Sequence, residues 1–246
     1  MEKTRWQKTR SAVGAVSLLL FPASFYYLSP VISLGGASLG ILAGSLIVFG
    51  VLLVSGMLLG RSFCSWVCPA GKIQDLAMQS RTGRFPRKAL AWLKYVVWAA
   101  WLGLLFILFH SSGGIKRVDF TFATTSGFSV GDLPSLIAYL AVVLAFFGLA
   151  LIGGRRTGCH TICWMAPFLV LGMKLGDLLR LKRPRLAVVE TPCSSCGLCD
   201  RQCPMSLEVS KFAAQGKPES ADCILCGACV DACPRKRLCL KWKNHA

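Results

Sequence analysis

Eight cysteines in the last quarter of the chain have the spacing of iron–sulfur cluster ligands. Two runs share the order Cys-x2-Cys-x2-Cys-x3-Cys-Pro, one from Cys193 to Pro204 and the other from Cys223 to Pro234. In this arrangement three closely spaced thiolates bind one [4Fe–4S] cluster, while the cysteine before proline binds the other cluster. The predicted ligands are therefore Cys193, Cys196, Cys199 and Cys233 for the first cluster, and Cys223, Cys226, Cys229 and Cys203 for the second.

Structural zinc explains these runs less well, because a tetrahedral site has no use for a third cysteine at the same step in both copies. Gly197 and Gly227 follow the second cysteine of each run, where the backbone must turn tightly around a cluster. Cys239 lies outside the pattern, and we interpret it as a lone thiol.

Four further cysteines form two Cys-x3-Cys pairs, Cys64 with Cys68 and Cys159 with Cys163. Each pair follows an apolar segment that ends in Gly-Arg, so this part of the chain resembles a duplicated unit. Cysteines four apart on a helix share one face, and together the pairs could hold a third metal or redox centre. The alternative is that they are small buried hydrophobic residues.

Two arginines stand at the matching exits of this duplicated unit, Arg61 and Arg155. They could neutralise thiolate charge. The alternative, which the sequence slightly favours, is that they anchor helix ends.

The composition predicts a membrane protein. The 246 residues are 54% hydrophobic, and the mean hydropathy is +0.56, both above the values of a soluble domain. The net charge of +17 comes from basic residues that flank apolar segments, which favours contact with anionic lipid over nucleic acid. The predicted transmembrane helices are Ser11–Ser33, Ala37–Gly60, Ala89–His110 and Pro134–Gly153.

Charge predicts the orientation. Of the 28 basic residues, only Lys116 and Arg117 lie in the 111–133 loop. The positive-inside rule then places both termini, the 61–88 loop and the ferredoxin domain in the cytoplasm, with the protein in the inner membrane. A reducing cytoplasm also suits thiolate-bound clusters.

We expect three parts: a four-helix transmembrane domain over 1–163, an interfacial helix and basic linker over 164–188, and a small α+β ferredoxin domain with two [4Fe–4S] clusters over 189–246. Lys182 to Arg185 would be a basic hinge at the lipid headgroups. Two histidines are weak catalytic candidates. His160 could carry a proton near the second cysteine pair, and His110 could take protons from a quinol. Ordinary surface or interfacial histidines are the alternative.

The order of parts resembles the NapH-type membrane ferredoxins and the wider polyferredoxin group that includes CcoG and NosR-like proteins. The likeness rests on four spans, Cys64-x3-Cys68-Pro69, the second cysteine pair and the double cluster motif, and it covers nearly the whole chain. In this chain Trp164 follows Cys163 and proline is delayed to Pro167, which points to a different branch.

The resemblance implies a quinol dehydrogenase subunit of a respiratory complex, which passes electrons between the quinone pool and a partner redox protein. A second hypothesis is a redox assembly or metal-handling factor that serves a maturing metalloenzyme. A passive ferredoxin anchor is a third, and it predicts that the four membrane-proximal cysteines are dispensable.

Overall fold

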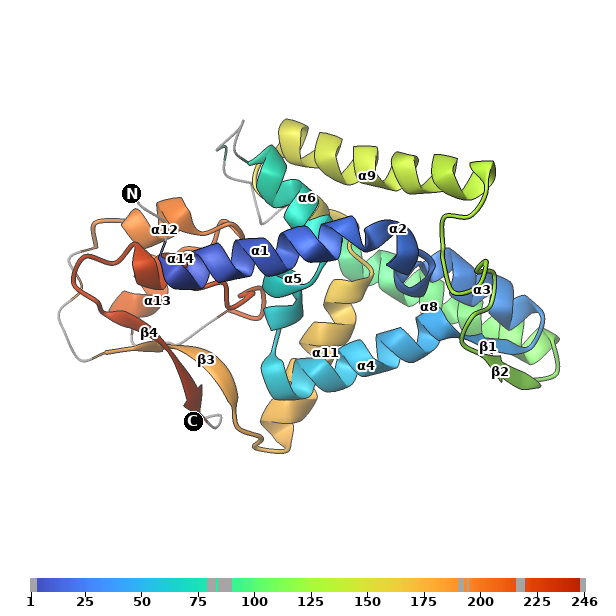
Figure 1. Ribbon diagram of the computed structural model, residues 1–246. Helices are drawn as coiled ribbons and strands as arrows, with labels where there is room; N and C mark the ends of the chain where they lie inside the picture. The colour runs from blue at the N-terminus through green and yellow to red at the C-terminus, as the bar shows by residue number, and fades with distance from the viewer. Residues whose placement is uncertain are drawn as a thin grey trace.

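The protein is mostly helical, with a small cysteine-rich domain at one end and long apolar helices running away from it (Figure 1). The computed structural model describes residues 4–78, 83, 90–189, 193, 195–215 and 220–243. The helices are α1 (Arg5–Leu19), α2 (Phe21–Ser24), the 3-10 helix η1 (Tyr26–Leu28), α3 (Pro30–Ser38), α4 (Gly44–Leu59), α5 (Ser62–Trp66), α6 (Pro69–Ala77), α8 (Leu93–Ser111), α9 (Leu133–Gly153), α10 (Thr157–Thr161), α11 (Met165–Leu178), α12 (Leu198–Gln202), α13 (Val209–Ala214) and α14 (Ala228–Asp231). The strands are β1 (Ile41–Ala43), β2 (Arg117–Asp119), β3 (Arg183–Val188) and β4 (Leu238–Lys243).

The first predicted span, Ser11–Ser33, is not one continuous helix. It divides into the end of α1, then α2, η1 and the start of α3. Pro22 lies in the first turn of α2, and Pro30 is the first residue of α3. Proline has no N–H to donate within a helix but fits its first turn, so each proline begins a new segment.

The prediction of the second span, Ala37–Gly60, was also too long. Ala37 and Ser38 end α3, and the next helix is Gly44–Leu59, because Ile41–Ala43 forms the strand β1, which pairs in parallel with β2. Gly40 precedes this strand with φ +70°, a conformation that glycine adopts without steric cost. The 16 residues of α4 fall short of the roughly 20 that a helix needs to cross a bilayer.

Two of the described helices, α8 and α9, are long and apolar enough to cross a membrane. The fourth predicted span agrees with α9 to within one residue. Ala89, the predicted start of the third span, lies outside the described residues. A capping box begins α9, in which the Asp132 side chain accepts a hydrogen bond from the Ser135 backbone N–H and the Ser135 hydroxyl accepts one from that of Asp132.

The predicted interfacial helix is α11, and it packs closely against α4 (Figure 1). Glycines allow this approach, because a Cβ on Gly56 would lie 2.6 Å from the Leu169 carbonyl oxygen. Gly172 and Gly176 face the α4 backbone in the same way. Phe49 of α4 stacks on Phe168 of α11 with ring centroids 5.3 Å apart, so α11 belongs to the core that supports the cysteine-rich domain.

The predicted basic hinge is instead the start of strand β3, which pairs antiparallel with β4 from Arg183 opposite Lys243 to Val188 opposite Leu238. Arg183 and Arg185 are 1% and 5% exposed, and both donate to the Asp177 carboxylate at the end of α11. Because a carboxylate already binds these two guanidinium groups, they connect the domain to α11 and do not face lipid headgroups.

Candidate metal centres

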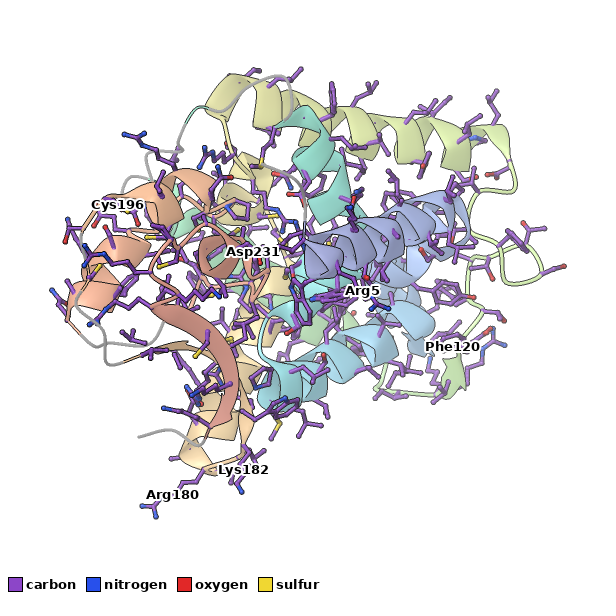
Figure 2. The ribbon with its side chains drawn as sticks, turned by 60° about the vertical axis from the view of Figure 1, so that its left-hand side comes forward. Arg5, Phe120, Arg180, Lys182, Cys196 and Asp231 are labelled. Atoms are coloured by element: carbon purple, nitrogen blue, oxygen red, sulfur yellow. The ribbon has the colours of Figure 1, made fainter. Side chains whose placement is uncertain are left out.

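An outer cavity is lined by all four cysteines predicted for the first cluster, Cys193, Cys196, Cys199 and Cys233. Cys196 is exposed and lies at the outer edge of the molecule (Figure 2). Pro234, Arg235 and Arg237 also line the cavity, and the Arg237 backbone N–H donates to the Cys233 sulfur at 3.3 Å. An N–H aimed at sulfur stabilises the charge of a bound thiolate.

An inner cavity is lined by the other predicted set, Cys203, Cys223, Cys226 and Cys229. Its remaining walls are largely apolar, with Met205, Ile224, Leu225 and Leu240 among them. The Leu207 backbone N–H donates to the Cys203 sulfur at 3.4 Å, as Arg237 does in the outer cavity. Four thiols, a shaped cavity and a matching N–H donor fit a [4Fe–4S] cluster in each place.

Gly197 and Gly227 begin α12 and α14 in the left-handed conformation, with φ of +70° and +75°. This agrees with the tight turn predicted after the second cysteine of each run. The equivalent turns place one short helix beside each cavity.

The two Cys-x3-Cys pairs lie in equivalent structures, which supports the predicted duplication. Helices α4 and α9 each end at a glycine with positive φ, Gly60 at +60° and Gly154 at +85°. A five-residue helix follows each glycine, α5 or α10, and carries the first cysteine of the pair. A longer helix then begins, α6 or α11. The predicted 61–88 loop is therefore partly helical.

The four cysteines of these pairs, which we call the membrane-proximal group, are all buried: Cys64, Cys68, Cys159 and Cys163. Burial raises the pKa of the Cys68 thiol well above its ordinary value, and the neighbouring Cys64, Cys159 and Cys163 raise it further. Burial, followed by the Cys159 and Cys64 thiols, raises the pKa of Cys163 to about 12. The two halves of the repeat thus bring their thiols into one electrostatically coupled group.

Among the described residues, no group of three or more His, Cys, Asp or Glu side chains is gathered tightly enough to hold a single metal ion. The eight ferredoxin cysteines were therefore grouped by the cavity that each one lines, and not by distances to a common metal ion.

Arginines from both halves of the repeat connect the membrane-proximal group to the cysteine-rich domain. Arg61 is 0% exposed and donates a hydrogen bond of 3.0 Å to Asp222, the residue that precedes Cys223 in the sequence. Arg155 donates to the Cys203 carbonyl oxygen at 3.2 Å. Both arginines, which follow the ends of α4 and α9, are therefore buried and bound to the cysteine-rich domain.

A second cation, Lys94 of α8, also binds Asp222, at 2.7 Å. Burial opposes charge on this carboxyl, but Arg61 and Lys94 together hold the pKa of Asp222 well below its ordinary value. Asp222 therefore remains ionised and ties α8 and the α4 exit to the domain.

Comparison with known proteins agrees with this arrangement. The chain matches the 4Fe-4S binding domain family twice, over residues 41–89 and 135–185, which are the two halves of the repeat. It matches the 4Fe-4S dicluster domain family over residues 192–238. No solved structure matches the chain.

Three relatives have ferredoxin or electron-transport names. The methylamine utilization ferredoxin-type protein MauN of Methylobacillus flagellatus is 29% identical over 79% of this chain and 67% of its own length. The ferredoxin-type protein NapH of Haemophilus influenzae is 28% identical over 76% and 64%. The chain belongs to the NapH-type 4Fe-4S ferredoxin family. The putative electron transport protein YccM of Escherichia coli is 22% identical over 78% of this chain and 54% of its length.

This NapH-type ferredoxin uses polar residues that the sequence reasoning missed. Gln74 of α6 donates to the Cys159 sulfur at 3.1 Å and accepts from the Gly158 backbone N–H at 2.9 Å. Asp75 accepts two hydrogen bonds from Arg156, each 2.8 Å long, and Arg156 also donates to the Cys64 carbonyl oxygen. For Gln74 and Asp75, the sequence signal was their position about two helical turns after Cys68.

The N-terminal helix also contacts the inner cavity of this ferredoxin. Gln7 donates to the Cys226 carbonyl oxygen at 2.9 Å and to Asp231 at 2.8 Å, and Trp6 donates to the same carbonyl at 3.3 Å. Helix α1 therefore reaches from the apolar region to the second cysteine run (Figure 1).

The two histidine candidates differ in position. His160 is fully buried and lies near enough to Asp222 to help lower the pKa of that carboxyl. His110 is exposed near the end of α8 that leads to β2, away from the cysteine-rich domain (Figure 1). The structure therefore places His160 in the buried interior beside the second cysteine pair and His110 on the surface.

Proposed function

We propose that this iron–sulfur electron-transfer protein is the quinol-oxidising subunit of a membrane redox complex, and that it passes electrons to a partner redox protein. When bound, each cluster exchanges one electron at a time, so two or more clusters together can take up the pair that a quinol releases with its two protons. The chain's own residues hold the clusters, insulate them and fix the charge around them.

The observation that carries this proposal is the succession of three cysteine groups. The outer and inner cavities adjoin, since Cys199 of the outer set contributes to the raised pKa of Cys229 in the inner set. Arg156 connects the inner set to the membrane-proximal group. It donates to the Cys64 carbonyl oxygen, and its positive charge partly offsets the rise that burial causes in the pKa of the Cys226 thiol. A succession of this kind suits transfer between a membrane substrate and a partner at the exposed Cys196.

We propose that the membrane-proximal group holds a third iron–sulfur centre. The buried Arg61 and Arg156 supply positive charge beside it, which offsets the charge of clustered thiolates. The alternative of a metal-handling site requires thiols that exchange cargo readily, and deep burial argues for a resident centre instead.

The membrane arrangement is proposed on charge and hydropathy. Helices α8 and α9 would span the bilayer, and α4 together with the broken α1–α3 segment would complete a four-helix domain. Lys116 and Arg117, the two basic residues of the far loop, lie at the end opposite the cysteine-rich domain (Figure 1). By the positive-inside rule that domain and both termini face the cytoplasm.

The test is anaerobic purification in mild detergent, followed by iron and sulfide counts and addition of a quinol. At four irons per cluster, about twelve irons support a third centre and about eight leave the ferredoxin domain alone loaded. Cys64→Ser and Cys159→Ser should each remove about four irons and block reduction by quinol. Cys239→Ser, outside every motif, is the matched control. Reduction only by a strong artificial reductant would refute quinol oxidation.

A further inference from the structure

A cavity of about 650 Å³ lies where α1 crosses α5, α6 and the cysteine-rich domain. It is separate from the two cysteine cavities described above. Its volume lies within the range of sites that enclose a small organic molecule.

Two of the proposed redox centres adjoin this cavity. Cys68, from the membrane-proximal group, lines one part of its wall. Pro204, which follows Cys203, and Ala228, which precedes Cys229, line another part. A molecule bound here would therefore lie beside cysteine motifs of both groups, which is the position required of a redox substrate.

The polar wall has donors and acceptors but no excess of one charge. Arg10 pairs with Asp75 at 3.4 Å, and Gln7 donates to Asp231. The Lys72 ammonium donates to the Ser11 hydroxyl at 2.8 Å and to the Ser11 carbonyl at 3.1 Å. Two cations and two carboxylates suit a neutral ligand with oxygen atoms better than a polyanion.

Apolar surface continues from this wall along α1. Ser11 and Gly14 line the cavity, and Leu18 lies one turn further along the same face of α1. Val67, beside Cys68, is 44% exposed. A ligand whose polar ring lies in the cavity can extend an apolar tail along this surface.

We infer that this cavity binds the ring of a lipid-soluble quinone or quinol, with Lys72 donating to a ring oxygen and the tail lying along α1. The inference rests on the proposed quinol oxidation and assigns it a site. Oxidation of the bound quinol breaks its two O–H bonds, passes two electrons to oxidised clusters and releases two protons to water.

The first test fills the cavity. A Cβ on Gly14 would meet only the flexible Lys72 side chain, at 3.3 Å, and otherwise ordinary contacts, so Gly14→Leu should place its side chain in the cavity. The matched control is Gly148→Leu on α9, where nothing lies within 4 Å. Decylubiquinone is titrated into the cluster-loaded full chain in detergent, and binding is followed by the quenching of tryptophan fluorescence, to which Trp66 in the cavity wall contributes. Gly14→Leu should weaken binding by about tenfold or more, and the control should not.

The second test keeps the space and removes the donor. Lys72→Met should weaken decylubiquinone binding by about tenfold, the loss expected for one hydrogen bond from a charged group. Lys174→Met, at an exposed position of α11, is the control. Iron content and melting temperature are measured for each variant, so that Lys72→Met decides the question if Gly14→Leu fails to fold.

Three outcomes separate the ideas. If Gly14→Leu and Lys72→Met bind decylubiquinone as their controls do, the site is elsewhere, and the proposed function survives if decylubiquinol still reduces the clusters. If binding weakens in both variants but quinol never reduces the unaltered protein, the site holds and the proposed function fails. If phosphatidylglycerol displaces the quinone completely, the cavity is a lipid site and the inference is overturned.

Discussion

Asp75→Asn removes a carboxylate whose two oxygens both accept hydrogen bonds from Arg156. The Arg156 guanidinium, which is only 1% exposed, then keeps its charge without this partner. Breaking a buried ion pair from one side costs about 3–5 kcal/mol, because the remaining charge stays buried without the carboxylate that bound it. Asp75 is 21% exposed, so water can partly replace it, and we expect a loss near the lower end, about 3 kcal/mol. For a chain of this length that lowers the melting temperature by about 6–12 °C.

The assay is thermal unfolding of the cluster-loaded protein in detergent, followed by tryptophan fluorescence. The control is Asp119→Asn, which breaks the Arg117–Asp119 pair, where Arg117 is 65% exposed. An exposed pair contributes less than about 1 kcal/mol, so the melting temperature should fall by about 4 °C at most.

A double variant tests whether the effect belongs to the pair. Asp75→Asn combined with Arg156→Gln should cost less than the two single changes added together, by about 1–3 kcal/mol of coupling. Additive losses, or an Asp75→Asn melting temperature equal to that of Asp119→Asn, would refute the reasoning that this pair holds α6 to the second half of the repeat.

Two further predictions concern helix packing and pH. Gly56→Leu should destabilise the protein by about 1–3 kcal/mol through overpacking against the Leu169 backbone, whereas Gly50→Leu, with nothing within 4 Å, should change the melting temperature little. Burial opposes the charge of Asp75, but Arg156 lowers the pKa of this carboxyl below 3.8. Its stabilisation is therefore complete above the unfolded pKa and is lost as pH falls through the folded value, so Asp75→Asn and unaltered protein should differ equally at pH 7 and pH 5 and converge only below about pH 4.

The cysteine groups could be predicted because their chemistry is written in local spacing. Each ferredoxin run lies within a dozen residues, and its spacing predicted that Cys233 and Cys203 would each lie with the first three cysteines of the other run, as the lining of the two cavities shows. That these cysteines bind clusters stays a prediction. Helix α9 was predicted nearly to its ends because its apolar stretch is uninterrupted and ends in Gly-Arg.

The incorrect predictions concern residues whose partners are distant in the sequence or whose ion pairs cannot be recognised from hydropathy. The apolar stretch at Ile41 reads as helix, but its backbone pairs with Arg117 in a strand. Arg183 and Arg185 were predicted to be a lipid-facing hinge because the sequence pattern shows their charge. It does not show that both side chains bind Asp177. Gln74 and Gln7 were missed because their partners are 85 and 219 residues away.

The contact of α1 with the cysteine-rich domain also sets an order of events during synthesis. Gln7 must wait for Cys226, which is 219 residues later. At about 5–20 residues per second, the ribosome takes about 11–44 s to make that stretch. During this interval Arg10 can already pair with Asp75, but Gln7 lacks the Cys226 carbonyl and Asp231. The first helix to be made therefore completes its contacts among the last.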